Sequence, residues 1–139
     1  MASRDIVNNI HVAPLISPAA ADSGNTPVVG AIVDTAGYES VALILNLGAL
    51  GTDAATFATT LEHGDDPALA DTSAPAASDL TAALSTMNFT GTADNSTLKI
   101  GYIGSRRYLR MTVTPSGNAA AAYISGVAVL GNARNKPAA

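Results

Sequence analysis

Residues 38–50 read YESVALILNLGAL, a β-branched and aliphatic run that follows the turn-like sequence DTAG. Such near-continuous apolarity is typical of a strand that is buried on both faces, so we predict a central strand here. The next run, ATFATTLEHGDD at 55–66, alternates, with Phe57 and Leu61 on one face and Glu62 on the other. Because only GTDA separates the two runs, we expect them to form a hairpin.

Further runs have the two-residue period of strands. In RRYLRMTVT, at 106–114, the apolar and polar side chains fall on opposite faces. The turn sequence PSGN leads from it into AAAAYISGVAVLG at 119–131, which predicts a second hairpin. STLKIGYIG at 96–104 and VVGAIVDT at 28–35 predict two more strands.

The two remaining segments have weaker patterns. IVNNIHVAPLIS, at 6–17, is either an edge strand or an extended arm, because Pro14 lacks a backbone donor. Over 64–95 the periodicity fades, and we expect a long loop with a short strand at 87–90. A turn or two of helix at 78–87 is the alternative, since Ser and Asp there can cap it.

Together these patterns predict an all-β protein, an antiparallel β-sandwich or barrel of about six to eight short strands with extended N- and C-terminal arms. The domain boundaries that follow are an N-terminal arm at 1–27, a β-sandwich domain at 28–131 and a C-terminal tail at 132–139. Alanine favours helix, but the Ala-rich stretch at 119–122 is short and leads directly into a β-rich run.

The composition indicates protein partners. Only 13% of the 139 residues are charged, about half the usual share, which suggests that partners cover much of the surface. The net charge of −4 disfavours nucleic acid and anionic membranes as partners. The N-terminus has no apolar run of signal-peptide length, and the apolar stretch at 41–50 is far too short to span a bilayer, so we expect a soluble chain.

Few residues are suited to catalysis. The densest polar group is Glu62, His63, Asp65 and Asp66, which we interpret as a strand end running into a polar turn, with a weak ion site as the alternative. The chain has no cysteine, no GxSxG nucleophile motif and no dinucleotide-binding glycine loop. We therefore expect no enzyme activity, no cofactor and no bound metal.

Three of the seven basic residues fall within five positions, at Arg106, Arg107 and Arg110. Strand alternation predicts that Arg106, Tyr108 and Arg110 form one row, and Arg and Tyr are enriched at protein interfaces. The hypothesis we favour is a subunit interface. A solvated or internally paired face is the second interpretation, and a nucleic-acid contact is the weakest.

Five large aliphatic side chains are grouped in the predicted N-terminal arm. They are Ile6, Ile10, Val12, Leu15 and Ile16. A disordered tail rarely has such a content, whereas an arm that lies on a neighbouring subunit uses apolar anchors of this kind. We expect these residues to contact a partner.

The order of these segments resembles a family of small proteins encoded among the head genes of tailed bacteriophages. The matching parts are the GYESV block, the strand that ends in EHGD, and the blocks GYIG, RRYLR and TVTP, over roughly residues 28–131. The resemblance implies a capsid decoration or cement protein, which binds the major capsid protein on the outside of the shell and bridges its subunits, often as a trimer. Its expected location is the virion surface, after assembly in the bacterial cytoplasm.

Two other functions stay open. A head-to-tail connector or tail protein would form a ring or tube, and no residue pattern separates it from a decoration protein. A carbohydrate-binding or adhesion module is less favoured, because such sites stack sugars on exposed aromatic rings and the chain has no Trp and only four Tyr.

Overall fold

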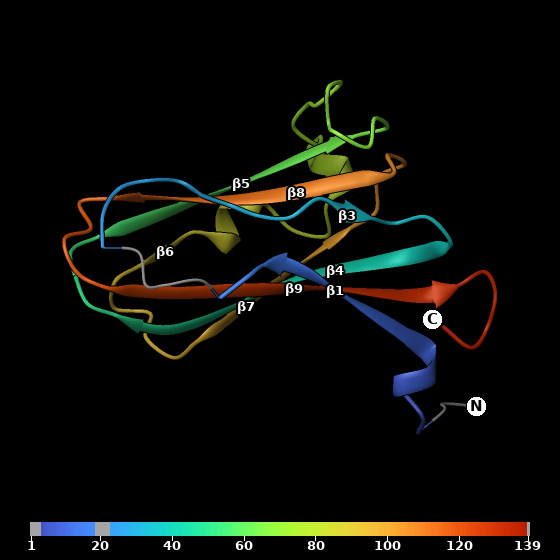
Figure 1. Cartoon of the computed structure of the whole chain (residues 1–139), viewed down its shortest axis with the longest axis horizontal. Coiled ribbons are helices and arrows are strands. Elements are labelled where there is room, and N and C mark those ends of the chain that lie inside the picture. The colour runs from blue at the N-terminus through green and yellow to red at the C-terminus, as the bar shows by residue number, and fades with distance from the viewer. Residues whose placement is uncertain (1–3, 19–22, 139) are drawn as a thin grey trace.

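The computed structural model describes residues 4–18 and 23–138, and it confirms the predicted β-sandwich (Figure 1). Two antiparallel sheets pack face to face. The four-stranded sheet contains, in spatial order, β1 (Ile10–Ile16), β9 (Ala122–Ala133), β4 (Tyr38–Leu50) and β7 (Thr97–Tyr102). The five-stranded sheet contains β2 (Val28–Val29), β8 (Tyr108–Ser116), β5 (Thr56–Gly64) and β6 (Phe89–Thr90), with β3 (Val33–Asp34) also paired to β8. The short 3-10 helices are η1 (Val7–Asn9), η2 (Ala77–Asp79) and η3 (Leu84–Met87).

The strand order is that of a jelly roll. Strands β2 and β3 both pair with β8, so they count as one interrupted strand. The two sheets then read 1-9-4-7 and 2/3-8-5-6, and consecutive strands mostly alternate between the sheets. This is the pattern of two interlocked Greek keys, which occurs in viral capsid proteins and in lectins.

Both predicted hairpins are wrong, because in each pair the two strands lie in different sheets. Strand β4 pairs with β9 and β7, and its successor β5 lies in the opposite sheet beside β8 and β6. Strands β8 and β9 are likewise in different sheets. The short connections at 51–55 and 117–121 therefore cross from one sheet to the other instead of closing a hairpin. The turn sequence alone does not reveal this difference.

The core lies between the sheets and is made by alternate residues of the long strands. Its largest fully buried side chains include Leu15, Leu43, Phe57, Leu61, Leu109 and Met111. Phe57 stacks on Phe89 with ring centroids 4.7 Å apart. Each such side chain stabilises the fold by about 1.5–3 kcal/mol.

The predicted arm is partly an integral strand. Residues 10–16 form β1, which pairs with β9, and the side chains of Leu15 and Ile16 are only 0% and 2% exposed in the core. Their predicted role as contacts to a partner is therefore wrong, since a core side chain cannot reach another chain. Residues 1–3 and 19–22 of the predicted arm, and residue 139 of the predicted tail, lie outside the described residues.

The predicted strand at 28–35 is interrupted at Gly30, where three strands approach one another. A Cβ at this position would lie 2.4 Å from the Leu15 carbonyl oxygen and 2.6 Å from that of Met111, so only glycine fits. The next residue, Ala31, donates its N–H to the Leu15 carbonyl at 2.9 Å. This bond joins β1 of one sheet to the interrupted strand of the other.

The segment at 64–95 is largely loop, with the predicted short strand present as β6 at Phe89–Thr90. Part of it lies along the edge of β7, where Thr81 donates to the Gly101 carbonyl at 3.0 Å and Ile103 donates to the Asp79 carbonyl at 2.7 Å. Within the described residues, no helix is long and apolar enough to cross a lipid bilayer.

Candidate protein interface

The outer face of the five-stranded sheet is mostly polar, although Val29 of β2, opposite Thr112, is 59% exposed. Its outward side chains, given by the register of β5, β6 and β8, include five threonines: Thr56, Thr60, Thr90, Thr112 and Thr114. We call these five residues the threonine face. Hydroxyl groups bond readily to water, so exposing the threonine face to solvent costs little free energy.

At one end of this face, Arg106 does not belong to a strand. It lies in the loop before β8, and its Nη1 donates to Asp65 Oδ2 at 2.6 Å. Asp65 also accepts the Arg107 backbone N–H at 3.2 Å. The hydrogen bond and charge of Asp65 raise the pKa of Arg106 above its usual value, so the guanidinium stays charged.

Arg107 is held by Asp34 of β3. Its Nε and Nη2 donate to the two carboxylate oxygens at 2.8 and 2.9 Å, a bidentate pair that holds the pKa of Asp34 below its usual range. The guanidinium also lies 5.0 Å from the centre of the Tyr108 ring. Tyr108 itself is only 9% exposed.

Arg110 pairs across the sheet with Glu62, which is directly opposite it in the register of β5 and β8. Its Nε and Nη2 each lie 2.8 Å from Glu62 Oε2. The side chains of Arg110 and Glu62 are 28% and 32% exposed. The predicted row of Arg106, Tyr108 and Arg110 is therefore not an open interface row: one member is in a loop, one is buried, and both arginines have carboxylate partners within the chain.

The polar group Glu62, His63, Asp65 and Asp66 does not gather into one site. Glu62 and Asp65 bind arginines, while His63 Nδ1 lies 2.8 Å from the Tyr102 hydroxyl in the interior. Asp66 Oδ1 accepts the N–H of Ala68 at 2.7 Å in a tight turn. Over residues 4–18 and 23–138, no three His, Asp or Glu side chains are close enough to hold a metal ion.

The outer face of the four-stranded sheet is different. Outward positions of three neighbouring strands carry mainly aliphatic side chains, which we call the apolar face: Ile10, Val12, Pro14, Val127, Val129, Ala42 and Ile44. They form cross-strand rows, because Val12 lies opposite Val129 and Pro14 opposite Val127. On the β4 side, Val127 lies opposite Ile44, so the rows run across the sheet without a break.

The apolar face is open to solvent in the isolated chain. Val12 is 52% exposed and Val127 is 40% exposed. The rows continue onto β7, where Lys99 lies opposite Ile44 and is the one charged residue in the Pro14 row. An exposed patch of contiguous aliphatic side chains typically marks a protein contact.

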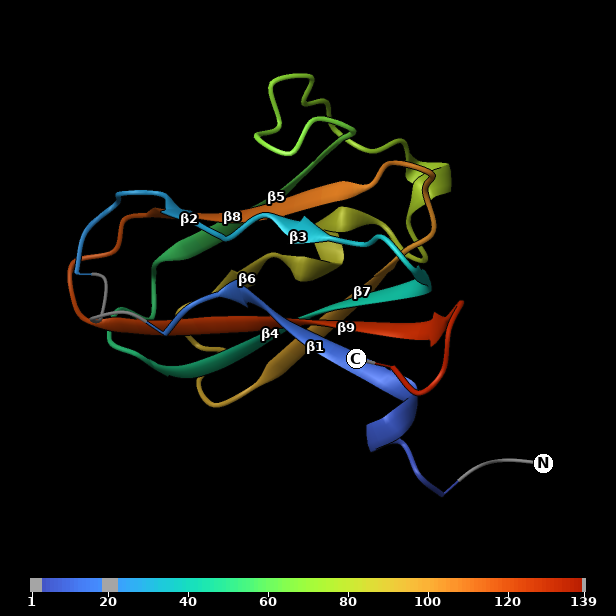
Figure 2. The same ribbon diagram turned by 45° about the vertical axis from the view of Figure 1, so that its right-hand side comes forward.

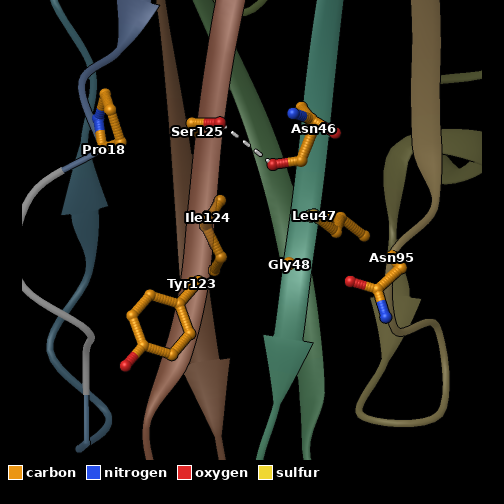
Figure 3. Close-up of a pocket in the computed structure, with 8 residues that line it drawn as sticks. All are labelled: Pro18, Asn46, Leu47, Gly48, Asn95, Tyr123, Ile124 and Ser125. Atoms are coloured by element: carbon orange, nitrogen blue, oxygen red, sulfur yellow. Dashed lines mark hydrogen bonds between the residues drawn. The ribbon is translucent and has the colours of Figure 1, made fainter.

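A hollow of about 330 Å³ lies at one end of this sheet, between β9 and β4 (Figure 3). Gly48 leaves the space, since a Cβ there would lie 3.0 Å from the Cβ of Tyr123. Figure 3 shows the Tyr123 ring on one side of Gly48 and the Asn95 amide on the other. Tyr123 is 54% exposed, so the hollow offers an aromatic ring and an amide to a partner group.

Sequence reasoning found part of this surface. Ile10 and Val12 were predicted contacts and do lie on the open face, and Ile6, another predicted contact, is 65% exposed near the start of β1. It missed Val127, Val129 and Ile44. The signal that could have found Ile44 is the continuous apolarity of 38–50, which was interpreted as burial on both faces, although Leu43, Leu45 and Leu47 are buried and Ile44 between them is not.

No protein-family model matches this chain, and a comparison with curated proteins finds no match. The resemblance to phage head proteins therefore stays a prediction, and the geometry of the two faces is the main basis for assigning a function.

Proposed function

We propose that this protein is a virion structural protein, a decoration or cement protein that binds the outside of a phage head shell through protein contacts alone. The observation that carries the proposal is the apolar face, an open sheet surface whose aliphatic rows have no covering element among the described residues. The resemblance in sequence and the jelly-roll strand order, which viral capsid proteins share, support it by analogy.

The mechanism of stabilisation would be mass action. A protein that binds the assembled lattice but not the free capsid subunits shifts the equilibrium toward the lattice. Burying aliphatic side chains contributes about 25 cal/mol per Å² of apolar area removed from water, so many weakly bound copies add up to a large effect on the whole shell.

The test is co-sedimentation of the purified protein with expanded empty shells assembled from the major capsid protein of the same virus. Saturation at a fixed ratio to capsid subunits is the expected result. If the purified protein forms a closed ring and does not bind the shells, the connector function is favoured instead.

One observation favours a second candidate, the carbohydrate-binding module. The hollow beside Tyr123 combines an exposed aromatic ring with Asn46, Asn95 and Ser125, a set that can stack on and hydrogen-bond a sugar ring. Titration with simple hexoses, followed by the NMR signals of Tyr123, separates the two functions, because a decoration protein would show no saturable shift.

A further inference from the structure

The edges of the two sheets differ in how well they are covered. Unpaired N–H and C=O groups at a sheet edge pair readily with another strand unless something covers them. The edge of β7 is covered by residues 79–81, and its outward Lys99 adds a charge. At the edges of the other sheet, β2, β3 and β6 have two residues each, too few to pair strongly with another chain.

The edge of β1 is the exception. Bonds from other segments reach only its flanks, where Ala31 donates to the Leu15 carbonyl and Ala138 donates to the Asn8 carbonyl, both at 2.9 Å. Between them, within the described part of the chain, the backbone groups of residues 10–14 bond only to β9. Figure 2 shows that β1 begins far from the five-stranded sheet and approaches it only toward its end. The open edge is therefore five residues long.

Pro14 indicates which backbone groups face outward. A proline in an edge strand has its nitrogen on the unpaired side, because it has no hydrogen to donate to the ladder. In an antiparallel ladder the backbone groups alternate in direction along the strand. The N–H groups of Ile10 and Val12 therefore also face the open edge, together with the carbonyls of Ile10, Val12 and Pro14.

We propose that this edge pairs with β1 of a second copy of the chain, antiparallel, about a two-fold axis at Val12. Each Val12 then donates to and accepts from Val12 of the second copy. The Ile10 N–H donates to the Pro14 carbonyl of the second copy. The Ile10 carbonyl lies opposite the proline nitrogen, which has no hydrogen, and it accepts from water instead. The open edge is thus complementary to itself, as a two-fold interface requires.

The side chains and charges fit a second copy. Residues 10–14 carry no Asp, Glu, Lys or Arg, so no like charges meet across the axis. The apolar faces of the two copies would join into one eight-stranded surface, with the half-exposed Val12 side chains in contact at its centre. Pairing of this kind closes at two copies, in contrast to the trimer expected from the resemblance.

The test uses a single cysteine, since the chain has none of its own. In a hydrogen-bonded antiparallel pair, opposite Cα atoms are about 5.5 Å apart, within the range that a disulfide spans. We expect Val12→Cys to give a covalent dimer on mild oxidation. Val127→Cys, on the same face but one strand inward, is the matched control and should stay monomeric on a non-reducing gel.

A second pair of variants tests the same axis in solution. Light scattering of the wild-type chain should give twice its mass of 13.9 kDa. Val12→Lys and Val12→Glu should each be monomeric, because like charges then face each other, and mixing the two should restore the dimer. A wild-type monomer, a trimer, or equal cross-linking of both cysteine variants would overturn the proposal. No shells are needed, so its failure is distinct from failure of the decoration function.

Discussion

The two outer faces of the sandwich meet the solvent in different ways. On the five-stranded sheet, threonines face water and the arginines bind carboxylates of the same chain, such as Arg110 with Glu62. On the four-stranded sheet, aliphatic rows such as Val12 with Val129 face water. Among the described residues, the arginines of the first face pair with carboxylates of the same chain, whereas no element covers the aliphatic rows of the second. The comparison teaches that the cluster of charged residues most visible in the sequence is not the surface most suited to a partner.

Strand β1 belongs to both the core and the apolar face, and this gives the largest expected effect. Leu15→Ala should lower the free energy of unfolding by about 2–5 kcal/mol, because it leaves a cavity in the core. Val12→Ala, on the open side of the same strand, leaves no cavity in the core and should cost about 1 kcal/mol or less. Urea unfolding measures both. If both variants lower the free energy of unfolding by the same small amount, β1 is a loosely attached arm and not an integral strand.

The next largest effect is on shell binding. Val127→Glu places a charge in the middle of the apolar face, and we expect it to weaken binding to empty shells tenfold or more, because the carboxylate must be desolvated. Thr112→Glu, the matched change on the threonine face, should alter the affinity less than twofold. Sedimentation titrations compare the two, with urea unfolding as the control for folding. The reverse ranking would move the interface to the other sheet.

The ion pair of Arg110 and Glu62 should contribute to stability and not to shell binding. Either Arg110→Glu or Glu62→Arg puts like charges directly opposite each other on neighbouring strands, at a cost of about 1 kcal/mol. The double reversal should recover most of this loss. A drop in shell affinity for the double variant, with stability restored, would show that Arg110 contacts a partner after all.

The smallest effect is on the pH dependence of stability. The pKa of Asp34 is lower in the folded protein than in the unfolded chain, because Arg107 binds the ionised carboxylate. Its contribution is therefore complete above the unfolded value of about 3.9 and is lost as the pH falls through the folded pKa. The side chain is half-exposed, so solvent screening limits the contribution to less than about 1 kcal/mol.

Thermal melts between pH 6 and pH 2.5 measure this contribution. Asp34→Asn should flatten the acid side of the stability curve the most, because it removes the titrating carboxyl. Arg107→Gln should flatten it less, because the Ala36 N–H still donates to Asp34 Oδ1 at 3.0 Å and still lowers the pKa of Asp34. An acid slope that is unchanged in Asp34→Asn would mean that another group sets the pH dependence.

The sequence predicted the positions of the strands better than it predicted which strands pair with each other. The alternating run at 106–114 corresponds to β8, but the strand begins only at Tyr108. Arg106 and Arg107 precede the strand, and their side chains bind Asp65 and Asp34. The strand at 38–50 was predicted with its observed bounds. Hairpins were predicted from short connections, but turn length cannot distinguish a hairpin from a crossing between sheets.

The candidate site was only partly predictable. Five aliphatic residues near the N-terminus were predicted as partner contacts. Leu15 faces inward by the ordinary alternation from Val12, but the sequence could not show that Ile16 also does, because a bulge between Pro14 and Ile16 breaks the alternation. Nor could it show that Asp34, far along the chain, lies within reach of Arg107. Both facts depend on tertiary contacts.

Cysteine footprinting tests the central claim most directly, namely that the apolar face is the assembly surface. Val127→Cys and Thr112→Cys place one thiol on each outer face, and the rate of thiol alkylation is measured for the free protein and in the presence of saturating shells. We predict that shells slow the labelling of Val127→Cys at least tenfold and leave Thr112→Cys unchanged. Protection of Thr112→Cys with Val127→Cys still reactive would contradict the account.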